Sequence, residues 1–192
     1  KLEPNAKVEL FLQSENKIKV TSGNSKFNLL CISSNNFPVS SEDFRSESFQ
    51  ISSQKLLKLL NKAKISISSD ETRHYLNGIY FHKTKIQNQS FLTGVATDSH
   101  RLSSSSLEID ENINFEPIIL PKKTVYQLIS LLEQGPDNIK ISNNKSKVKF
   151  EMNNGVLISK VIDGRFPDYT KVVPRDNNKI LQIKLNAFKN SI

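Results

Sequence analysis

The side chains best suited to catalysis or binding stand side by side at Asp98-Ser99-His100-Arg101, where a carboxylate, a hydroxyl, an imidazole and a guanidinium follow one another. Asp, Ser and His are the residue types of a hydrolase triad, in which the imidazole lies between the serine and the carboxylate. Three consecutive residues do not reach that geometry, because neighbouring side chains of a strand point to opposite faces. A small hydrolase is therefore the weakest interpretation that we weigh.

Signatures of other chemistry do not occur in the sequence, which has no G-x-S-x-G, Walker A, G-x-G-x-x-G, H-E-x-x-H or paired C-x-x-C motif. His74, His82 and His100 are too scattered to predict a metal site, and no motif predicts a cofactor. Cys31 is the only cysteine, which excludes an internal disulfide and fits a reducing cytoplasm. Binding is therefore favoured over catalysis.

The composition indicates what could be bound. The 192 residues are 36% hydrophobic and 24% charged, as is ordinary for a globular protein, but the net charge is +8. An excess of positive charge favours a polyanionic partner such as nucleic acid, although charge alone is weak evidence. No apolar run approaches the ~20 residues of a membrane span, so we expect no membrane partner.

Alternating apolar residues and turn residues predict the elements around Asp98–Arg101. We predict strands at residues 8–12, 17–21, 27–32, 49–52, 73–81, 90–97, 100–107, 117–120, 138–142, 147–152 and 156–162. A helix is predicted over residues 53–65, and another from Pro121, at the first helical position, to a stop at Gly135-Pro136. The unit strand–helix–three strands thus occurs twice in succession, which predicts an α+β fold.

Each helix combines an apolar face with a polar one. The apolar residues are Leu56, Leu57, Leu60 and Ala63 on the first helix, and Val125, Leu128 and Leu132 on the second. The opposite faces carry Lys55, Lys58 and Lys62, and Lys123, Gln127 and Ser130. A lysine stripe of this kind is usually only a solvated surface.

An internal repeat predicts the domain organisation. The segment at 17–20 resembles 147–150, 130 positions later; Phe37-Pro38 matches Phe166-Pro167, 129 later; and 49–51 matches 181–183, 132 later. A near-constant offset is typical of a duplicated domain. We expect residues 1–46 to end one copy, 47–175 to form a complete copy and 176–192 to begin a third, with the boundary in the acidic, Ser-rich connector 40–47. Because the chain begins without Met, we expect it to be a piece of a longer protein.

Three motifs resemble one known family. The octapeptide Val-Ala-Thr-Asp-Ser-His-Arg-Leu at 95–102 resembles the most recognisable motif of the bacterial sliding clamp, the β subunit of DNA polymerase III. His-Tyr-Leu-Asn-Gly at 74–78 and Asp-Gly-Arg-Phe-Pro-Asp-Tyr at 163–169 fit the same family, in its order and at its spacing. The resemblance implies the DNA-clamp fold, with six such domains in a homodimeric ring, helices facing the DNA and sheets outside.

The function that the resemblance implies is binding without catalysis. A non-catalytic, cytoplasmic accessory subunit would encircle double-stranded DNA without reading its sequence and would tether the replicative polymerase. Lysines suit sliding, because flexible point charges meet phosphates of any sequence. The implied DNA-binding residues are Lys55, Lys58, Lys62, Arg73, His74, Tyr75, Lys122 and Lys123. The family position of His74 is often aromatic.

The resemblance also implies a pocket for partner peptides. In the family, short Gln-Leu-x-Leu-Phe-like tails of the polymerase, the clamp loader and repair proteins insert between the second and third domains. The implied second-domain wall comprises Leu76, Thr97, Ser99, His100, Arg101, Leu102, Pro167, Lys171 and Val172. Ser99 stands where the family usually has Gly, and Lys171 where Arg is common.

Two alternatives accompany this interpretation. One is a nucleic-acid-binding α+β module that forms no ring, and the weaker one is the hydrolase considered first. In the family, the ring closes between the first domain of one chain and the third domain of another. We therefore expect these 192 residues alone to form a monomer or a non-native dimer that does not encircle DNA.

Overall fold

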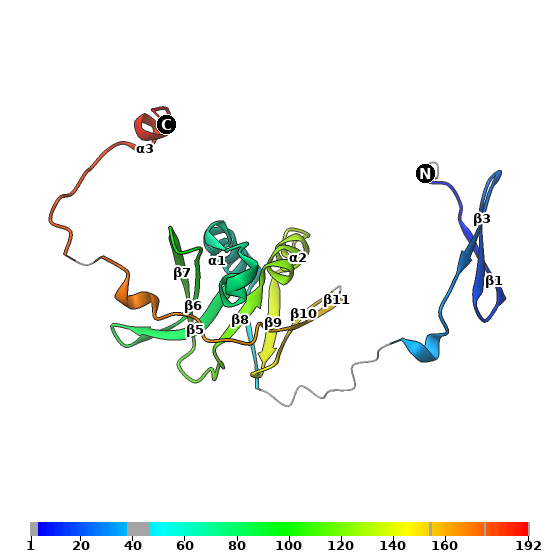
Figure 1. Cartoon of the computed structure of the whole chain (residues 1–192), viewed down its shortest axis with the longest axis horizontal. Helices are drawn as coiled ribbons and strands as arrows, with labels where there is room; N and C mark the ends of the chain where they lie inside the picture. The colour runs from blue at the N-terminus through cyan, green and yellow to red at the C-terminus, as the bar shows by residue number, and fades with distance from the viewer. Residues whose placement is uncertain (1–3, 38–46, 154, 175, 192) are drawn as a thin grey trace. The chain divides into compact units, whose positions relative to one another are not determined.

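The computed structural model describes residues 4–37, 47–153, 155–174 and 176–191, and the chain divides into two units, Lys1–Asp43 and Phe44–Ile192 (Figure 1). The connector predicted at 40–47 lies outside the described residues except for Glu47, and so does Pro38 of the predicted repeat.

The first unit is an antiparallel sheet in the strand order β1-β2-β3. Its strands are β1 (Glu9–Ser14), β2 (Lys17–Ser22) and β3 (Ser25–Leu30), and the short helix η1 (Ser34–Asn36) follows. The register aligns Leu10 with Val20 and Val20 with Phe27, so one face of the sheet is apolar. Val20 and Ser22 of β2 are buried on this face, whereas Leu10 is 71% exposed.

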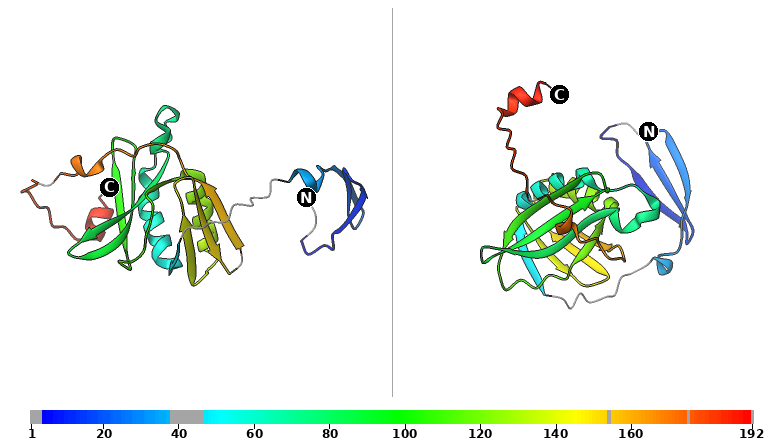
Figure 2. Two further views of the ribbon diagram at one scale, coloured as in Figure 1. Left: turned by 90° about the horizontal axis from the view of Figure 1, so that it is seen from below. Right: turned by 60° about the vertical axis from the view of Figure 1, so that its left-hand side comes forward.

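The second unit contains two four-stranded antiparallel sheets, in the orders β11-β10-β9-β4 and β7-β6-β5-β8, with the helices α1 and α2 side by side (Figures 1 and 2). Its strands are β4 (Ser48–Ser52), β5 (Gly78–Ile86), β6 (Gln89–Thr97), β7 (Leu102–Ile109), β8 (Ile118–Pro121), β9 (Asn138–Asn143), β10 (Lys147–Met152) and β11 (Gly155–Lys160). Its helices are α1 (Ser53–Ala63), η2 (Lys64–Ser66), η3 (Glu71–Leu76), α2 (Lys122–Leu132), η4 (Tyr169–Lys171) and α3 (Leu185–Lys189). This architecture confirms the predicted α+β class and the two strand–helix–three-strand units.

One core joins both sheets to both helices, since α1 contacts β4, β6 and β7 while α2 contacts β5 and β8. On α2 the predicted face is confirmed, because Val125, Leu128 and Leu132 are all buried. On α1 the predicted face is too narrow: Leu59 is buried as well, and Leu57 is only half-buried. Leu59 is covered because β6 approaches closely, and a Cβ at Gly94 would lie 2.7 Å from its Cδ2 atom.

The strand ends agree with the sequence predictions to within two residues, with one exception. The strand predicted at 73–81 is wrong: η3 occupies residues 71–76 and β5 begins at Gly78. Asp70 causes the difference, because its carboxylate accepts hydrogen bonds from the backbone and the hydroxyl of Thr72 and holds the chain in a turn. A glycine follows because a Cβ at Gly78 would lie 2.2 Å from the carbonyl oxygen of Leu120.

Two further details differ from the predictions. Pro121 does not begin α2 but precedes it in an extended conformation (φ −59°, ψ 145°), because it still pairs with Gly78 in the sheet. The helix predicted over 53–65 ends at Ala63 and continues as η2. In the described part of the chain, no helix has both the length and the apolarity needed to cross a bilayer.

Replacing Leu128 with alanine should lower the free energy of unfolding by about 2–5 kcal/mol, because the side chain is fully buried and leaves a cavity. Gln127→Ala, on the exposed face of the same helix, is the matched control and should stay within about 0.5 kcal/mol. Urea unfolding followed by tyrosine fluorescence measures this unit alone, since Tyr75, Tyr80, Tyr126 and Tyr169 all lie in it. Equal losses in both variants would contradict the core assignment.

Candidate functional site

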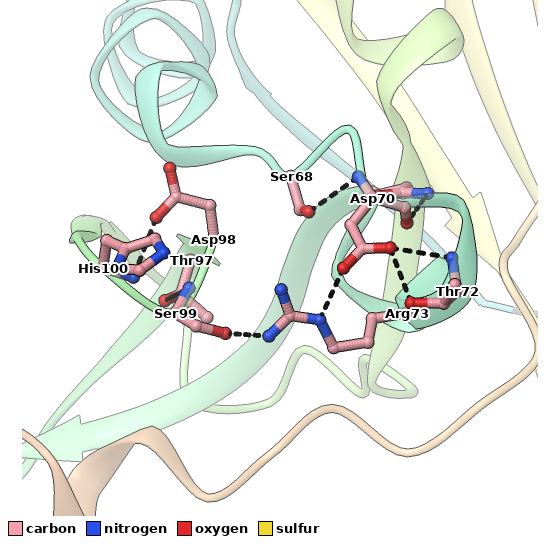
Figure 3. A network of polar contacts seen from close by, with 9 residues as sticks. Ser68, Asp70, Thr72, Arg73, Thr97, Asp98, Ser99 and His100 are labelled. Atoms are coloured by element: carbon pink, nitrogen blue, oxygen red, sulfur yellow. Dashed lines mark hydrogen bonds and ion pairs between the residues drawn. The ribbon is translucent and has the colours of Figure 1, made fainter.

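Three segments far apart in the sequence meet at one end of the sheet β7-β6-β5-β8. They are η3, the β6–β7 turn at residues 97–102 (the tip), and residues 163–174, which follow β11 (the strap). Arg73 Nη1 of η3 donates a hydrogen bond to Ser99 Oγ of the tip at 2.5 Å (Figure 3). His74 Nε2 lies 3.2 Å from the carbonyl oxygen of Asp163 in the strap. The hydrogen bonds thus connect η3 to both other segments.

The strap is held by a second apolar cluster on the face of the sheet that the helices do not cover. Along β5, Ile79 and Phe81 point to the helices, so Tyr80 and His82 point to the opposite face. Phe166 of the strap is buried against that face and stacks on Tyr80 with ring centroids 4.9 Å apart. The complete cluster comprises Leu76, Val95, Ile119 and Phe166, with Tyr75, Tyr80, Leu102, Ile162 and Tyr169 partly buried around them. We call it the outer cluster.

Each segment contains the same acid-capped turn, in which an aspartate accepts from a backbone N–H two residues on and pairs with a cation three residues on. The pairs are Asp70 with Arg73, Asp98 with Arg101 and Asp168 with Lys171. The matching N–H donors belong to Thr72, His100 and Thr170. Local hydrogen bonds of this kind fix short turns without help from the core.

The capping hydrogen bonds lower the pKa values of all three carboxyl groups. Hydrogen bonds from Thr72, and then from Arg73, lower the pKa of Asp70 to about 2. Backbone hydrogen bonds from Arg101 and His100 lower the pKa of Asp98 to about 2. The Thr170 hydroxyl is the main cause of the lowered pKa of Asp168. Because these pKa values are depressed, the caps stabilise the turns fully at neutral pH and are lost as the pH falls through the lowered pKa values, which for Asp70 and Asp98 are about 2.

The tip is a closed turn, not the start of a strand as predicted for His100 and Arg101. The N–H groups of both residues donate to Asp98, at 3.1 and 3.0 Å, so they are not available to a sheet ladder. Ser99 adopts φ +79°, a left-handed conformation that favours glycine. The hydroxyl of Ser99 is bonded to Arg73 and the carboxylate of Asp98 to its own turn, so His100 does not lie between them (Figure 3). This geometry excludes a triad in the described conformation.

A cavity of about 640 Å³ lies between the tip and the strap. Eight of the nine predicted pocket residues line it: Leu76, Thr97, Ser99, His100, Arg101, Leu102, Pro167 and Val172. Lys171 does not, because its side chain extends into solvent and pairs with Asp168. The volume and the mixed apolar and polar lining are typical of a site for a small ligand or a peptide side chain.

The sequence prediction missed four residues of this cavity, namely Asp168, Tyr169, Val173 and Pro174. All four belong to the strap and are sequence neighbours of residues that were predicted. The available signals were the motif at 163–169, which ends in Asp168-Tyr169, and the apolar run Val172-Val173-Pro174 directly after Lys171. A larger cavity of about 750 Å³ lies between β4 and β7, with the acidic residues Glu108, Asp110 and Glu111 in its lining.

The predicted DNA-binding residues fall into two groups. Lys55, Lys58 and Lys62 are exposed on α1, and Lys123 is exposed at the start of α2. The other group lies beside the tip: Arg73 and His74 are engaged as described, and Tyr75 is half-buried in the outer cluster. Lys122 connects the groups, since its ammonium donates to Ser69, directly before the capping Asp70. Lys55 also lines the acidic cavity, so it is less suited to phosphate than Lys58 and Lys62.

Comparisons with known proteins cover the same region. Residues 50–168 match the family described as DNA polymerase III beta subunit, central domain. The whole chain is 36% identical to the beta sliding clamp of Caulobacter vibrioides and covers 52% of that protein. The beta sliding clamp of Escherichia coli K12 is 29% identical over 189 residues, which are 98% of this chain and 50% of that protein. The chain therefore spans about half the length of the curated relatives it matches.

Solved structures agree with the sequence relatives. The DNA polymerase sliding clamp of Caulobacter crescentus superposes with a TM-score of 0.87 at 36% identity, over all of this chain and 52% of that one. A sliding clamp from Bartonella birtlesii bound to griselimycin superposes with a TM-score of 0.84 at 35% identity, over 93% of this chain and 48% of that one. Fold and sequence thus point to the same relatives.

The Ser99 hydroxyl and the left-handed backbone act in opposite directions on the tip, and two substitutions separate them. Ser99→Ala removes the hydrogen bond to Arg73 and keeps the unfavourable φ, whereas Ser99→Gly removes the bond but relieves the φ. We expect the alanine variant to be less stable than the glycine variant by more than about 1 kcal/mol, because a Cβ at this positive φ is unfavourable. Urea unfolding and hydrogen exchange at the 97–102 amides measure the difference, and the reverse order would contradict the conformation of the tip.

Proposed function

The chain belongs to the family of the DNA polymerase III beta subunit, the bacterial sliding clamp, and from this premise we propose that the whole protein encircles duplex DNA and tethers the replicative polymerase to it. Its role is that of a non-catalytic processivity factor acting in the cytoplasm as a homodimeric ring. Residues 1–46, 47–175 and 176–192 are proposed to belong to the first, second and third clamp domains. The strand order β1-β2-β3 in one unit and β9-β10-β11 in the other supports this assignment.

The observation that carries the DNA-binding part is the exposed lysine face of the helix pair. Lys58 and Lys62 of α1 and Lys123 of α2 extend from the side opposite the buried leucines, on helices that are in contact with each other. Ammonium groups on flexible stems attract phosphates without selecting a base sequence. A surface of this kind holds DNA and still permits movement along it, which is what a sliding clamp requires.

The cavity between tip and strap is proposed to bind the short hydrophobic tails of the polymerase and of clamp-loader subunits. Leu76, Leu102 and Val172 offer apolar surface to leucine or phenylalanine side chains, and His100 and Arg101 offer polar groups at the rim. Peptide sites commonly combine an apolar pocket with a few polar groups that fix orientation. The acid-capped turns on both sides supply a preformed shape, which lowers the entropy lost on binding.

Replacing Lys55, Lys58 and Lys62 together with glutamate should weaken binding to a fluorescein-labelled DNA duplex. The slope of log K against log salt should flatten by roughly 0.9 per lost phosphate contact. Thermal stability should change little, because all three side chains are exposed.

The matched control reverses three other exposed lysines: Lys140 on β9, Lys145 in the turn before β10 and Lys160 at the end of β11. It changes the net charge equally but leaves the helices untouched. An unchanged slope in the α1 variant, or equal losses in the two variants, would show that the α1 lysines only solubilise the protein.

Replacing Leu102 with alanine should weaken binding of a labelled Gln-Leu-Ala-Leu-Phe peptide about tenfold, because a buried hydrophobic anchor is worth ~1.5–3 kcal/mol and Leu102 supplies part of its contact. DNA binding should not change, since the lysine face is elsewhere. Leu157→Ala is the control, as Leu157 is also a half-buried leucine but packs against the main core. Equal peptide affinities of wild type and Leu102→Ala would place the peptide site elsewhere.

A further inference from the structure

His82 lies behind the candidate peptide cavity and is not part of its lining. It is half-buried on the outer face of β5, where its ring stacks on Tyr80 with centroids 4.5 Å apart and an interplanar angle of 15°. Tyr80 in turn stacks on Phe166, so three rings form a continuous column. The ring of Tyr169 meets His82 edge-on, at 5.6 Å and 69°. The Nε2 atom of His82 and the hydroxyl of Tyr169 are hydrogen-bonded at 3.0 Å.

Tyr169 is the last residue of the strap with substantial burial. Beyond it, Thr170, Lys171 and Pro174 are exposed, and Val172 and Val173 are 70% and 42% exposed. Val172, Val173 and Pro174 nevertheless form one wall of the cavity. Because these three residues have little packing of their own, the position of the wall depends on where η4 begins, and Tyr169 is its first residue.

The contacts of Tyr169 therefore determine the shape of the cavity. Its ring belongs both to the cavity lining and to the outer cluster, and its hydroxyl reaches His82. Apolar packing alone permits a tyrosine ring to slide over its neighbours, whereas a hydrogen bond to a ring that is itself stacked specifies one position. The stack on Tyr80 prevents His82 from following Tyr169 if the strap moves outward.

We propose that His82 is a positioning residue of the peptide site, which holds the 172–174 wall in place through the hydroxyl of Tyr169. The inference rests on the proposed peptide-binding function. Burial lowers the pKa of His82, so the imidazole is neutral at neutral pH and can share this hydrogen bond as donor or acceptor.

The test compares three variants of the 192-residue chain. His82→Phe keeps an aromatic ring and removes the nitrogen, Tyr169→Phe keeps the ring and removes the hydroxyl, and the double variant removes both partners. We expect each single variant to bind the Gln-Leu-Ala-Leu-Phe peptide three- to tenfold more weakly, with most of the change in the dissociation rate. The double variant should be no weaker than either single one, because both substitutions break the same interaction.

Two further variants separate positioning from general destabilisation. His82→Gln can still hydrogen-bond to the Tyr169 hydroxyl, and we expect it to recover part of the affinity lost in His82→Phe. Thr84→Val is the matched control: Thr84 follows His82 on the same face of β5, and its hydroxyl is hydrogen-bonded to that of Thr93 in β6 at 2.7 Å. It should leave peptide affinity unchanged, even though it removes a part-buried hydrogen bond of the same sheet.

A readout without peptide keeps this inference distinct from the proposed function. The methyl resonances of Val172 and Val173 should shift and broaden in His82→Phe and Tyr169→Phe but not in Thr84→Val. If Leu102→Ala weakens peptide binding while the methyl resonances and affinity of His82→Phe match wild type, the positioning role is wrong and the peptide site stands. If the methyl resonances move but Leu102→Ala has wild-type affinity, His82 positions the wall and the wall serves no peptide.

Discussion

The arrangement of both candidate surfaces depends on one constraint, which is that the sheet β7-β6-β5-β8 must be covered on both faces. Alternate residues of β5 are apolar or aromatic on both sides, with Ile79 and Phe81 towards the helices and Tyr80 and His82 away from them. The helices cover one face and present their lysines to solvent on the other side. The strap covers the opposite face and ends as the wall of a cavity. Burying one sheet thus separates a basic surface from an apolar pocket.

The turns that border the pocket satisfy their own hydrogen bonds. Asp70, Asp98 and Asp168 each cap backbone N–H groups of their own turn, and each pairs with the cation three residues on. Such turns need no burial to keep their shape, so they can border a cavity that is open to solvent. The left-handed Ser99 shows that the tip is determined by these contacts, since its backbone is unfavourable for a residue with a Cβ.

Sequence periodicity predicted the helices and strands, whose apolar residues recur at regular spacing. Motifs predicted most of the residues that line the cavity between tip and strap. The apolar face of α2 and nearly all strand ends follow from alternation and helical spacing, because these elements are amphipathic. The strand expected at 73–81 failed because a single capping carboxylate, that of Asp70, outweighs the β propensity of the residues after it. Leu59 was missed because it lies at the edge of the helical stripe, and only the close approach of β6 at Gly94 buries it.

In the pocket, too, contacts between residues far apart in the sequence could not be predicted from local patterns. Resemblance to a family located Thr97–Leu102 and Pro167, but no local pattern relates His82 to Tyr169, which is 87 positions away. That contact exists because the strap crosses the outer face of the sheet, and the crossing is a property of the fold. Residues whose role is to hold other residues are therefore the ones that a sequence conceals.

The two proposed kinds of binding require opposite mechanical properties, and the structure supplies both. A peptide tail needs a fixed cavity. Hydrogen bonds tie the tip and the strap to η3, and ring contacts tie the strap to β5. Sliding on DNA needs charges that exchange phosphates freely, and exposed lysines on long flexible stems meet that need. Arg73 is the exception among the basic candidates, since its guanidinium is held by Asp70 at 2.9 Å and by Ser99 at 2.5 Å. A phosphate that bound Arg73 would have to displace Asp70 or Ser99 from the guanidinium. Loss of the hydrogen bond to Ser99 would release the tip from η3. We therefore infer that the lysine face, rather than Arg73, carries the greater share of any sliding contact with DNA.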